Sequence, residues 1–426
     1  MNAFIDDNMA VIRRRWPMLA SHLARIEAVA VERVELVEGL DSTLRIDGVQ
    51  LTSRHGRQSE AQLQAKALPV DCHEATLYGT GLGDLQAVLL ASEQLTQLDV
   101  YILNAALLKL VLSLLDQRHW LNDERVRLHL ADNQADIIVP FAVYPAELVL
   151  VAESQAKVRD RIVAELEVPY VNGLQAQQQP RMNAILANNQ AFFRDDKDVA
   201  ALFSQQTRRV WIAAPGPSLA KHYATLQSKQ NRDCLIALDT AVKPLTEQGI
   251  TPDIVVTLDM EITPAILPGC ACPLVYFPLT NTELLASWPG PRYLALTGSP
   301  QFATLRNNLG YASLYSDGSV IHPALDLAVN MGAEEVVLFG ADFAFSGQQT
   351  HAGWADGALG LGANDTQEWT INGRGERVAT LRNLRGYLCG VERFIAEHGQ
   401  VTFYNTSRDG ALITGAVFHP AFTEAS

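Results

Sequence analysis

Residues 210–219 read VWIAAPGPSL, a hydrophobic run that ends in a proline–glycine–proline–serine turn. The run is typical of a buried β-strand, and a helix is expected to follow the turn. The first amides of a helix have no partner within it, so a turn at this place can bind an anion. Gly216 allows a positive φ or lets a ligand approach the backbone closely. Pro217 stiffens the chain, and Ser218 is a candidate helix cap. The stretch predicts either a phosphate-binding turn or an ordinary capped turn.

Two strand-like runs follow, and each of them ends in an aspartate. CLIALD ends at Asp239, which Thr240 follows, and DIVVTLD ends at Asp259. Open parallel sheets bind ligands at the carboxyl ends of their strands, so both carboxylates are expected beside the PGPS turn. They would hold ribose hydroxyls, an amine, or a magnesium ion bound to phosphates; the alternative is that they only cap helices. Their common place beside the turn favours a binding role.

A third segment, residues 316–354, contains two more candidates for the same edge. Gly318 and Ser319 precede a stretch whose apolar residues have helical spacing. A glycine and a serine at the start of a helix are suited to bind a phosphate oxygen. We therefore group them with the nucleotide-binding candidates.

The same segment supplies the candidates for catalysis. The strand-like run EVVLFG is followed by Asp342, Phe343 and a glycine-containing loop with His351. A histidine near a strand-end aspartate can act as a general base near neutral pH, although a loop histidine can also be inert. We predict Asp342 and His351 as catalytic residues. His322 is a weaker candidate, and His222 is expected to face solvent.

The first half of the chain carries a glycine-rich turn. In YGTGLGDL, Gly79, Gly81 and Gly83 lie between a predicted strand and a predicted helix, as in dinucleotide-binding domains. The strand that should supply an acidic ribose ligand ends instead in Asn104. A structural role for these glycines is therefore favoured over a nucleotide site.

The alternation of strand and helix patterns predicts an α/β protein. We expect a Rossmann-like, mostly parallel sheet flanked by helices, preceded by a smaller Rossmann-like or α+β N-terminal domain. A helix is expected at 8–28. The alternating runs at 31–38 and 42–53 indicate a small antiparallel sheet. Strands of the N-terminal domain include DVYILN, RVRLHLA and DIIVPF, and a polar, glutamine-rich stretch of loop and helix follows. In the second half, strands are expected at 209–214, 234–238, 253–258, 274–278, 293–297 and 335–340. The predicted domains are 1–70, 71–180 and 181–426.

The composition excludes several classes of partner. The 426 residues carry a net charge of −14, so bulk charge does not attract nucleic acid or an anionic membrane. No stretch is long and apolar enough to span a membrane, and the N-terminus lacks the pattern of a secretory signal, which makes the cytoplasm the expected location. The five cysteines have no framework spacing; Cys270 and Cys272 are expected to be reduced thiols rather than a metal site.

Positive charge concentrates near the C-terminus, where four arginines lie within a dozen residues. They would offset an anionic substrate or form a solvated helix face. The arginines are Arg374, Arg377, Arg382 and Arg385.

Taken in order, these motifs resemble the motility-associated-factor glycosyltransferases. The resemblance covers roughly residues 180–420 and rests on GPSL, on PDIVVTLD, on the GSVIHPAL and GADFAF segments with His351, and on the final GALITG. These bacterial proteins transfer nonulosonic acids to flagellin, and their central domain is similar to archaeal 6-hydroxymethyl-dihydropterin diphosphokinase. It also resembles bacterial sialyltransferases that use CMP-activated sugars.

The resemblance implies roles for the candidate residues. Gly216, Pro217 and Ser218 match the nucleotide-binding turn, and Asp239 and Asp259 match the strand-end acids. Gly318, Ser319, Asp342, Phe343 and His351 match the second half of the site.

Three functions are compatible with these assignments. The first is a glycosyltransferase with a CMP-activated nonulosonic donor and flagellin or a glycan as acceptor. The second is a magnesium-dependent diphosphokinase that uses ATP and a pterin-like alcohol, with Asp239 and Asp259 as metal ligands. The third is a non-catalytic protein that binds a nucleotide or a nucleotide sugar.

Overall fold

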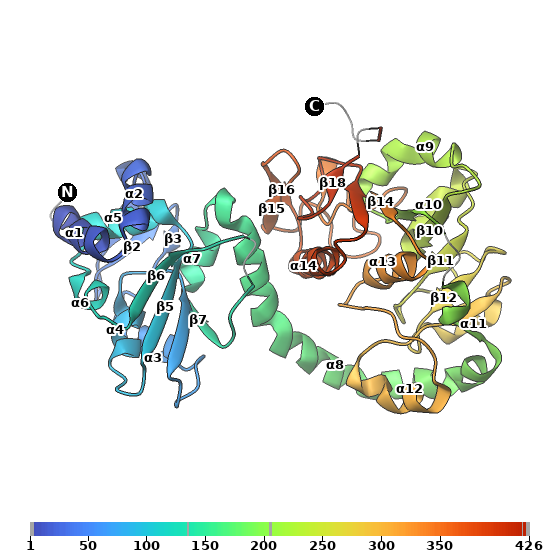
Figure 1. The fold of residues 1–426 in the computed structure, drawn as a ribbon, viewed down its shortest axis with the longest axis horizontal. Coiled ribbons are helices and arrows are strands. Elements are labelled where there is room, and N and C mark those ends of the chain that lie inside the picture. The colour runs from blue at the N-terminus through green and yellow to red at the C-terminus, as the bar shows by residue number, and fades with distance from the viewer. Residues whose placement is uncertain (1–3, 134–135, 204–206, 420, 423–426) are drawn as a thin grey trace. The chain divides into compact units, whose positions relative to one another are not determined.

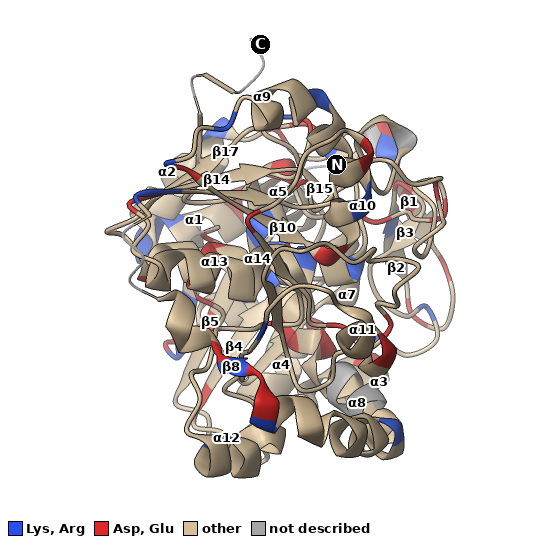
Figure 2. Ribbon diagram, turned by 90° about the vertical axis from the view of Figure 1, so that its right-hand side faces the viewer, with Lys and Arg blue, Asp and Glu red and all other residues tan. Residues whose placement is uncertain are grey.

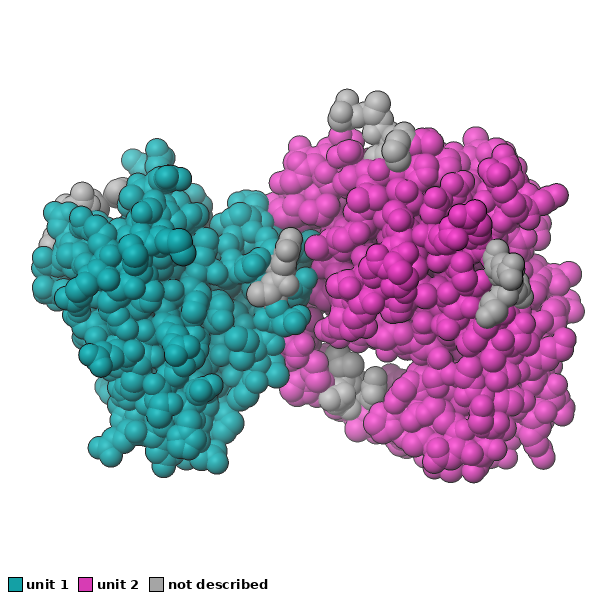
Figure 3. Space-filling model, in the orientation of Figure 1, with its two compact units in different colours: residues 1–162 teal, residues 163–426 magenta. Residues whose placement is uncertain are grey.

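A computed structural model describes residues 4–133, 136–203, 207–419 and 421–422. The chain forms two compact units, residues 1–162 and 163–426 (Figures 1 and 3), here called the first and second units. Both contain a parallel sheet flanked by helices, which confirms the predicted α/β class. The division into three domains stays a prediction. No helix within the described residues is long and apolar enough to cross a membrane.

The first unit begins with two helices where the sequence predicts one. Helix α1 (Ile5–Arg15) ends at Trp16, and α2 (Pro17–Arg25) begins directly after it. Pro17 restricts the residue before it and lacks an N–H, so the helix is interrupted there. The predicted antiparallel sheet is confirmed. Its strands are β1 (Val34–Val37), β2 (Thr43–Ile46) and β3 (Val49–Gln50).

The parallel sheet of this unit has four strands in the order β6-β5-β4-β7. The strands are β4 (Glu74–Tyr78), β5 (Gln97–Ile102), β6 (Val126–Leu130) and β7 (Phe141–Val143). The associated helices are α3 (Arg57–Ala65), α4 (Asp84–Leu90), α5 (Ala105–Leu114), α6 (Arg118–Leu121) and α7 (Pro145–Val149). The strand expected at 136–141 begins only at Phe141, because Pro140 has no N–H for a ladder hydrogen bond.

Protein side chains fill the glycine-rich turn of the first unit. Gly79, Gly81 and Gly83 all have positive φ, and a Cβ on Gly81 would lie 2.3 Å from the ring of Tyr144. The Oε1 atom of Glu147 accepts hydrogen bonds from the backbone N–H groups of Thr80, at 2.6 Å, and Gly81. Glu147 is fully buried, and this burial raises the pKa of its carboxyl group. An internal carboxyl group therefore occupies the place where an anionic ligand would bind such a turn.

We predict that Glu147→Ala lowers the free energy of unfolding by about 2–4 kcal/mol, because it leaves buried amides unpaired and opens a cavity. Glu147→Gln keeps an acceptor for these amides and should cost less. Urea unfolding of the full chain compares the two variants with the wild type. Equal stability of both variants would contradict the role assigned to the Glu147 oxygen.

The second unit is built on a nine-stranded sheet in the order β18-β17-β14-β9-β10-β11-β12-β13-β8, in which every neighbouring pair is parallel. All six strands that the sequence predicts for this unit are present. The strands are β8 (Lys197–Asp198), β9 (Arg209–Ala213), β10 (Cys234–Leu238), β11 (Ile254–Val256), β12 (Leu274–Tyr276), β13 (Arg292–Leu294), β14 (Glu335–Phe339), β17 (Thr402–Asn405) and β18 (Val417–Phe418).

Helices cover both faces of this sheet (Figure 1). One core cluster packs α13 (Ile321–Asn330) and α14 (Arg382–Glu397) on one face. The other packs α9 (Tyr223–Gln227), α10 (Asp239–Glu247) and α11 (Thr282–Ser287) on the opposite face. Alternate residues of the strands point into the two clusters, as the two-residue period of a strand requires. The remaining elements are α8 (Ala156–Asp195), α12 (Ala303–Leu309) and the hairpin β15 (Trp369–Ile371) and β16 (Arg377–Ala379).

The strand order reverses at β9. From β9 the chain adds β10, β11, β12 and β13 on one side, and it later adds β14 and β17 on the other. The connection from β9 therefore leads to a strand on one side of it, and the connection from β14 leads to a strand on the other side. The crevice that opens between the carboxyl ends of such strands is the usual ligand site of an open α/β sheet.

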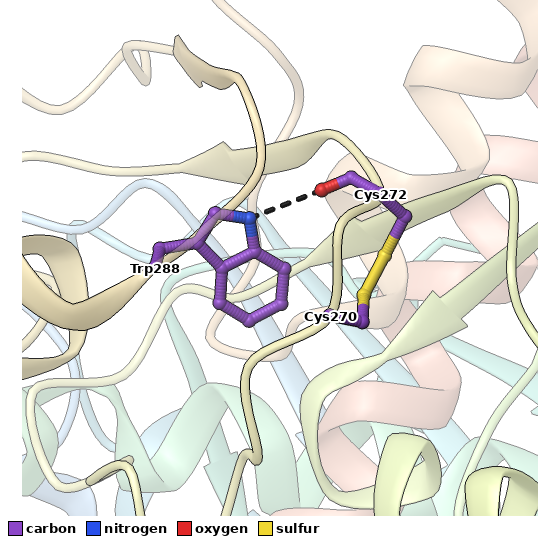
Figure 4. The surroundings of a disulfide bond; sticks show 3 residues. All are labelled: Cys270, Cys272 and Trp288. Carbon is purple, nitrogen blue, oxygen red and sulfur yellow. Dashed lines mark hydrogen bonds between the residues drawn. A yellow bond between two sulfur atoms is a disulfide. The ribbon is translucent and has the colours of Figure 1, made fainter.

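Two expectations about individual residues are wrong. Cys270 and Cys272 form a disulfide (Figure 4) in place of two reduced thiols, since their Cα atoms lie 5.4 Å apart, within the range of a disulfide. The indole N–H of Trp288 donates to the Cys272 carbonyl at 3.0 Å. The pair precedes β12 and so lies at the amino edge of the sheet, opposite the crevice. His222 is buried against the ring of Phe339 and does not face solvent.

Candidate functional site

The PGPS turn connects β9 to a short 3-10 helix, η4 (Pro217–His222). Gly216 has a φ of −59°, so the turn does not need glycine for its backbone angles. A Cβ on Gly216 would instead lie 2.4 Å from the carbonyl oxygen of Gly340 and 2.6 Å from the carboxylate of Asp342. The Gly216 N–H donates to that same Gly340 carbonyl at 2.9 Å. Glycine is therefore required here because the loop after β14 packs directly on the turn.

Asp342 is joined to the turn by two buried hydrogen bonds. Its carboxylate accepts the backbone N–H of Ser218 at 2.7 Å and the Ser218 hydroxyl at 2.6 Å. Asp342 is 2% exposed, and burial raises its pKa to about 6, although the hydrogen bonds from Ser218 oppose this. Ser218 is not the helix cap predicted from the sequence. Its donors hold Asp342, which makes Asp342 a positioning residue for the turn.

Asp239 lies at the next strand end, as the first residue of α10. It accepts the Thr240 N–H at 2.7 Å and the Thr257 hydroxyl at 3.1 Å. Burial, with a smaller contribution from the charge of Asp259, raises the pKa of Asp239 to about 6. Asp259 itself is exposed, and its side chain accepts the Glu261 N–H at 2.9 Å. The two aspartates are thus close enough for their charges to interact, as the sequence predicts.

These two carboxylates fit a magnesium ion only in combination with a substrate. Magnesium is commonly bound by one or two carboxylates together with phosphates and water. Within the described part of the chain, no group of three or more His, Cys, Asp and Glu side chains could hold a metal ion. Asp239 and Asp259 would therefore supply two ligands, and substrate phosphates and water would have to supply the others.

His351 lies in the loop after β14, at the same carboxyl edge of the sheet. The N–H of Ala352 donates to the Pro215 carbonyl at 2.8 Å, and the indole of Trp354 donates to the Thr240 carbonyl at 3.0 Å. His351 therefore lies beside the residues that follow both β9 and β10. Its Nδ1 atom is buried and has no hydrogen-bond partner among the described residues. Burial lowers the pKa of His351, which favours the neutral form of its ring.

Gly318 and Ser319 precede α13, as predicted, but the Ser319 amide is already used within the protein. The Nδ1 atom of His322 accepts the N–H groups of Asp317 and Ser319, each at 3.2 Å. The other ring nitrogen of His322 pairs with the Tyr387 carbonyl at 3.0 Å. His322 is fully buried, and this lowers its pKa. His322 therefore fixes the start of α13.

Phe343 has a φ of +47°, which is rare for a residue other than glycine. The hydroxyl of Thr380 donates to the Phe343 carbonyl at 2.6 Å and helps to hold this backbone. Such strained residues cost about 1–3 kcal/mol and are concentrated at functional sites. Phe343 lies directly after Asp342, at the start of the loop that contains His351.

The arginines of the C-terminal region lie in different surroundings. Arg382 and Arg385 both bind the carboxylate of Glu368, and Arg377 stacks on the ring of Trp369. Arg374 pairs with Asp409, a residue that sequence reasoning missed, and Lys221 pairs with the same carboxylate. Only the glycine next to Asp409, in the SRDGA segment, gave a sequence signal for this loop.

The first unit has a shallow cavity, which differs from the edge just described. It has a volume of about 390 Å³ and lies between α3 and α4. Its lining includes Asp84, which is paired with Arg57, and otherwise alanine, valine and glutamine side chains. None of these groups is a candidate base or nucleophile, so we place the functional site at the sheet edge of the second unit.

Comparison with known proteins finds a similarity in the part of the chain that carries this edge. Residues 183–348 match the family model described as 6-hydroxymethylpterin diphosphokinase MptE-like, which confirms the resemblance predicted from the motifs. The matched residues include the PGPS turn and every candidate aspartate, and they end before His351. No curated protein matches the chain. A similar solved structure is a Maf glycosyltransferase from Magnetospirillum magneticum AMB-1, with a TM-score of 0.44, 15% identity, and coverage of 99% of this chain and 75% of that one.

The buried aspartates generate a testable pH dependence. Asp239 and Asp342 have folded-state pKa values raised from 3.8 to about 6. Between these values the folded protein binds more protons than the unfolded chain, so the stability that each contributes is present at low pH and is lost as the pH rises toward 6.

We predict that the free energy of unfolding falls less steeply with rising pH in Asp342→Asn than in the wild type. The difference in slope should be of the order of 1 kcal/mol per pH unit. Urea unfolding at pH 4.5, 5.5 and 6.5 measures the effect. If the slope of stability against pH in this window were the same in the variant and the wild type, Asp342 would not have a raised pKa.

Proposed function

We propose that the second unit is a glycosyltransferase that moves a nonulosonic sugar from a CMP-activated donor to a hydroxyl group of a protein or glycan, with flagellin as one candidate acceptor. The observation that carries the proposal is His351, whose buried Nδ1 atom has no hydrogen-bond partner among the described residues and which is held beside the ends of β9 and β10. The ordered motifs of residues 180–420, which resemble those of the motility-associated-factor glycosyltransferases, support the proposal. An unpaired buried nitrogen also suggests that a bound ligand completes its hydrogen bonding.

His351 supplies the base of the proposed reaction. The acceptor oxygen forms a bond to the anomeric carbon while the bond from that carbon to the phosphate oxygen of the donor breaks. The acceptor proton passes to the His351 ring, and the electron pair leaves with the phosphate of CMP. In this proposal Asp239, Thr240 and Asp259 hold the ribose or the sugar. Ser218 and Asp342 keep the turn beside them in position.

We predict that His351→Gln lowers kcat roughly 10²- to 10⁴-fold, with a smaller effect on KM, because it removes a base without emptying the site. Sugar transfer from a CMP donor is the measurement. The control is His398→Gln, at the C-terminal end of α14, where the histidine pairs with the Phe394 carbonyl. Wild-type turnover in His351→Gln would contradict the assignment.

The same variant tests the pH profile. A base must be neutral to act, so kcat/KM should rise with pH through the His351 pKa and then level off. Burial lowers that pKa from 6.5, so the rise should lie below pH 6.5. A rising limb above pH 7, or a limb that persists unchanged in His351→Gln, would rule out His351 as the group observed.

A second candidate is a magnesium-dependent diphosphokinase. It is favoured by the description of the matching family and by the interacting charges of Asp239 and Asp259. In that reaction a pterin-like alcohol attacks the β-phosphorus of ATP, the alcohol loses its proton, and AMP leaves. Bound magnesium would neutralise phosphate charge, and the two aspartates would orient the ion.

Ligand-dependent thermal stability separates the two reactions. For the glycosyltransferase we expect CMP to raise the melting temperature, with the same shift in EDTA and in magnesium. A shift with ATP that requires magnesium, and that Asp259→Asn abolishes, would favour the diphosphokinase and contradict the first proposal.

A further inference from the structure

Three segments that are distant in sequence bring two cations to one carboxylate beside the PGPS turn. The Lys221 ammonium of η4 lies 2.8 Å from a carboxylate oxygen of Asp409, in the loop after β17. The Arg374 guanidinium, from the tip of the β15–β16 hairpin, lies 3.3 Å from the other oxygen. We call these three residues the Asp409 cluster.

The cluster is fixed to the edge of the sheet that carries the candidate site. Gly410, next to Asp409, packs so closely on Asp342 that a Cβ there would lie 2.7 Å from the Asp342 Cα. The N–H of Ala411 donates to the Asp342 carbonyl at 2.7 Å, and Ala411 also pairs with Asn372, two residues before Arg374. The hairpin, the loop after β17 and the loop after β14 are therefore joined around Asp342.

The cluster presents two cationic side chains beside one carboxylate. Both cationic side chains are reachable by a ligand, because Lys221 is 45% and Arg374 33% exposed. Acidic and basic residues are otherwise interspersed along the ribbon (Figure 2). Exposed ion pairs contribute little to stability.

The turn itself has few donors left for a phosphate. Pro217 has no N–H, and both the N–H and the hydroxyl of Ser218 are used by Asp342. The Gly216 N–H is used by Gly340. A phosphate bound at this edge must therefore find its donors outside the turn. Lys and Arg together supply the charge and the directed N–H groups that phosphate oxygens prefer.

We propose that Lys221 and Arg374, held together by Asp409, bind the phosphate group of the nucleotide. The proposal rests on the function proposed above, because it assigns the phosphate subsite of that same edge. Asp409 fixes the two cations in advance, so that one phosphate can bridge them without a large cost in side-chain ordering.

The test measures binding of CMP, cytidine and inorganic pyrophosphate to the full chain by calorimetry. The variant is Lys221→Met combined with Arg374→Met, and the two single variants are measured as well. The matched control is Arg208→Met, because Arg208 forms an exposed ion pair with Glu334 at the amino edge of the same central strands. Thermal unfolding verifies that each variant folds.

We expect the double variant to bind CMP and pyrophosphate roughly tenfold to a hundredfold more weakly than the wild type. Cytidine affinity should be the same in both, and Arg208→Met should behave as the wild type. The proposal is overturned if the double variant binds CMP within threefold of the wild type, or if the wild type binds neither CMP nor pyrophosphate.

The two proposals fail in different ways. Loss of phosphate binding in the double variant, with no sugar transfer by the wild type from any CMP donor, would leave the subsite standing and refute the proposed function. Sugar transfer by the wild type, with an unchanged donor KM in the double variant, would refute the subsite and leave the function standing.

Discussion

The two hydrogen bonds from Ser218 to Asp342 determine the form of the site. They join the turn after β9 to the loop after β14, the two connections that diverge where the strand order reverses. The approach is so close that Gly216, Gly340 and Gly410 each have backbone or carboxylate atoms where a Cβ would lie. The crevice of an open sheet is normally found at this point. The contact between Ser218 and Asp342 therefore determines which hydrogen-bonding groups of the crevice remain for a ligand.

The first unit uses the same arrangement. Its sheet also reverses beside the strand before the glycine turn, and Glu147 follows β7 across that reversal, as Asp342 follows β14. In each unit a buried carboxyl group accepts a hydrogen bond from an amide of the turn. A glycine turn after a strand therefore does not by itself establish a phosphate site. The second unit also has a loop histidine, His351, and two exposed cations, Lys221 and Arg374, near its turn.

Local patterns were sufficient to predict most of the fold but not the use of the site residues. Hydrophobic runs located the central strands, and strand-end positions located Asp239, Asp259 and Asp342. The partner of Ser218 lies 124 residues away, and that of Lys221 lies 188 residues away, so no local pattern could show that their donors were engaged. The same limit explains the error at His222, which is buried against the distant Phe339.

The central claim is that the ligand binds at the carboxyl edge of the second unit. Hydrogen–deuterium exchange of the full chain with and without CMP tests it directly, because exchange reports protection by segment. We predict slower exchange at 213–223, 238–241 and 340–354, and no change at 79–86. Protection at 79–86 with none at the other three segments would contradict the account.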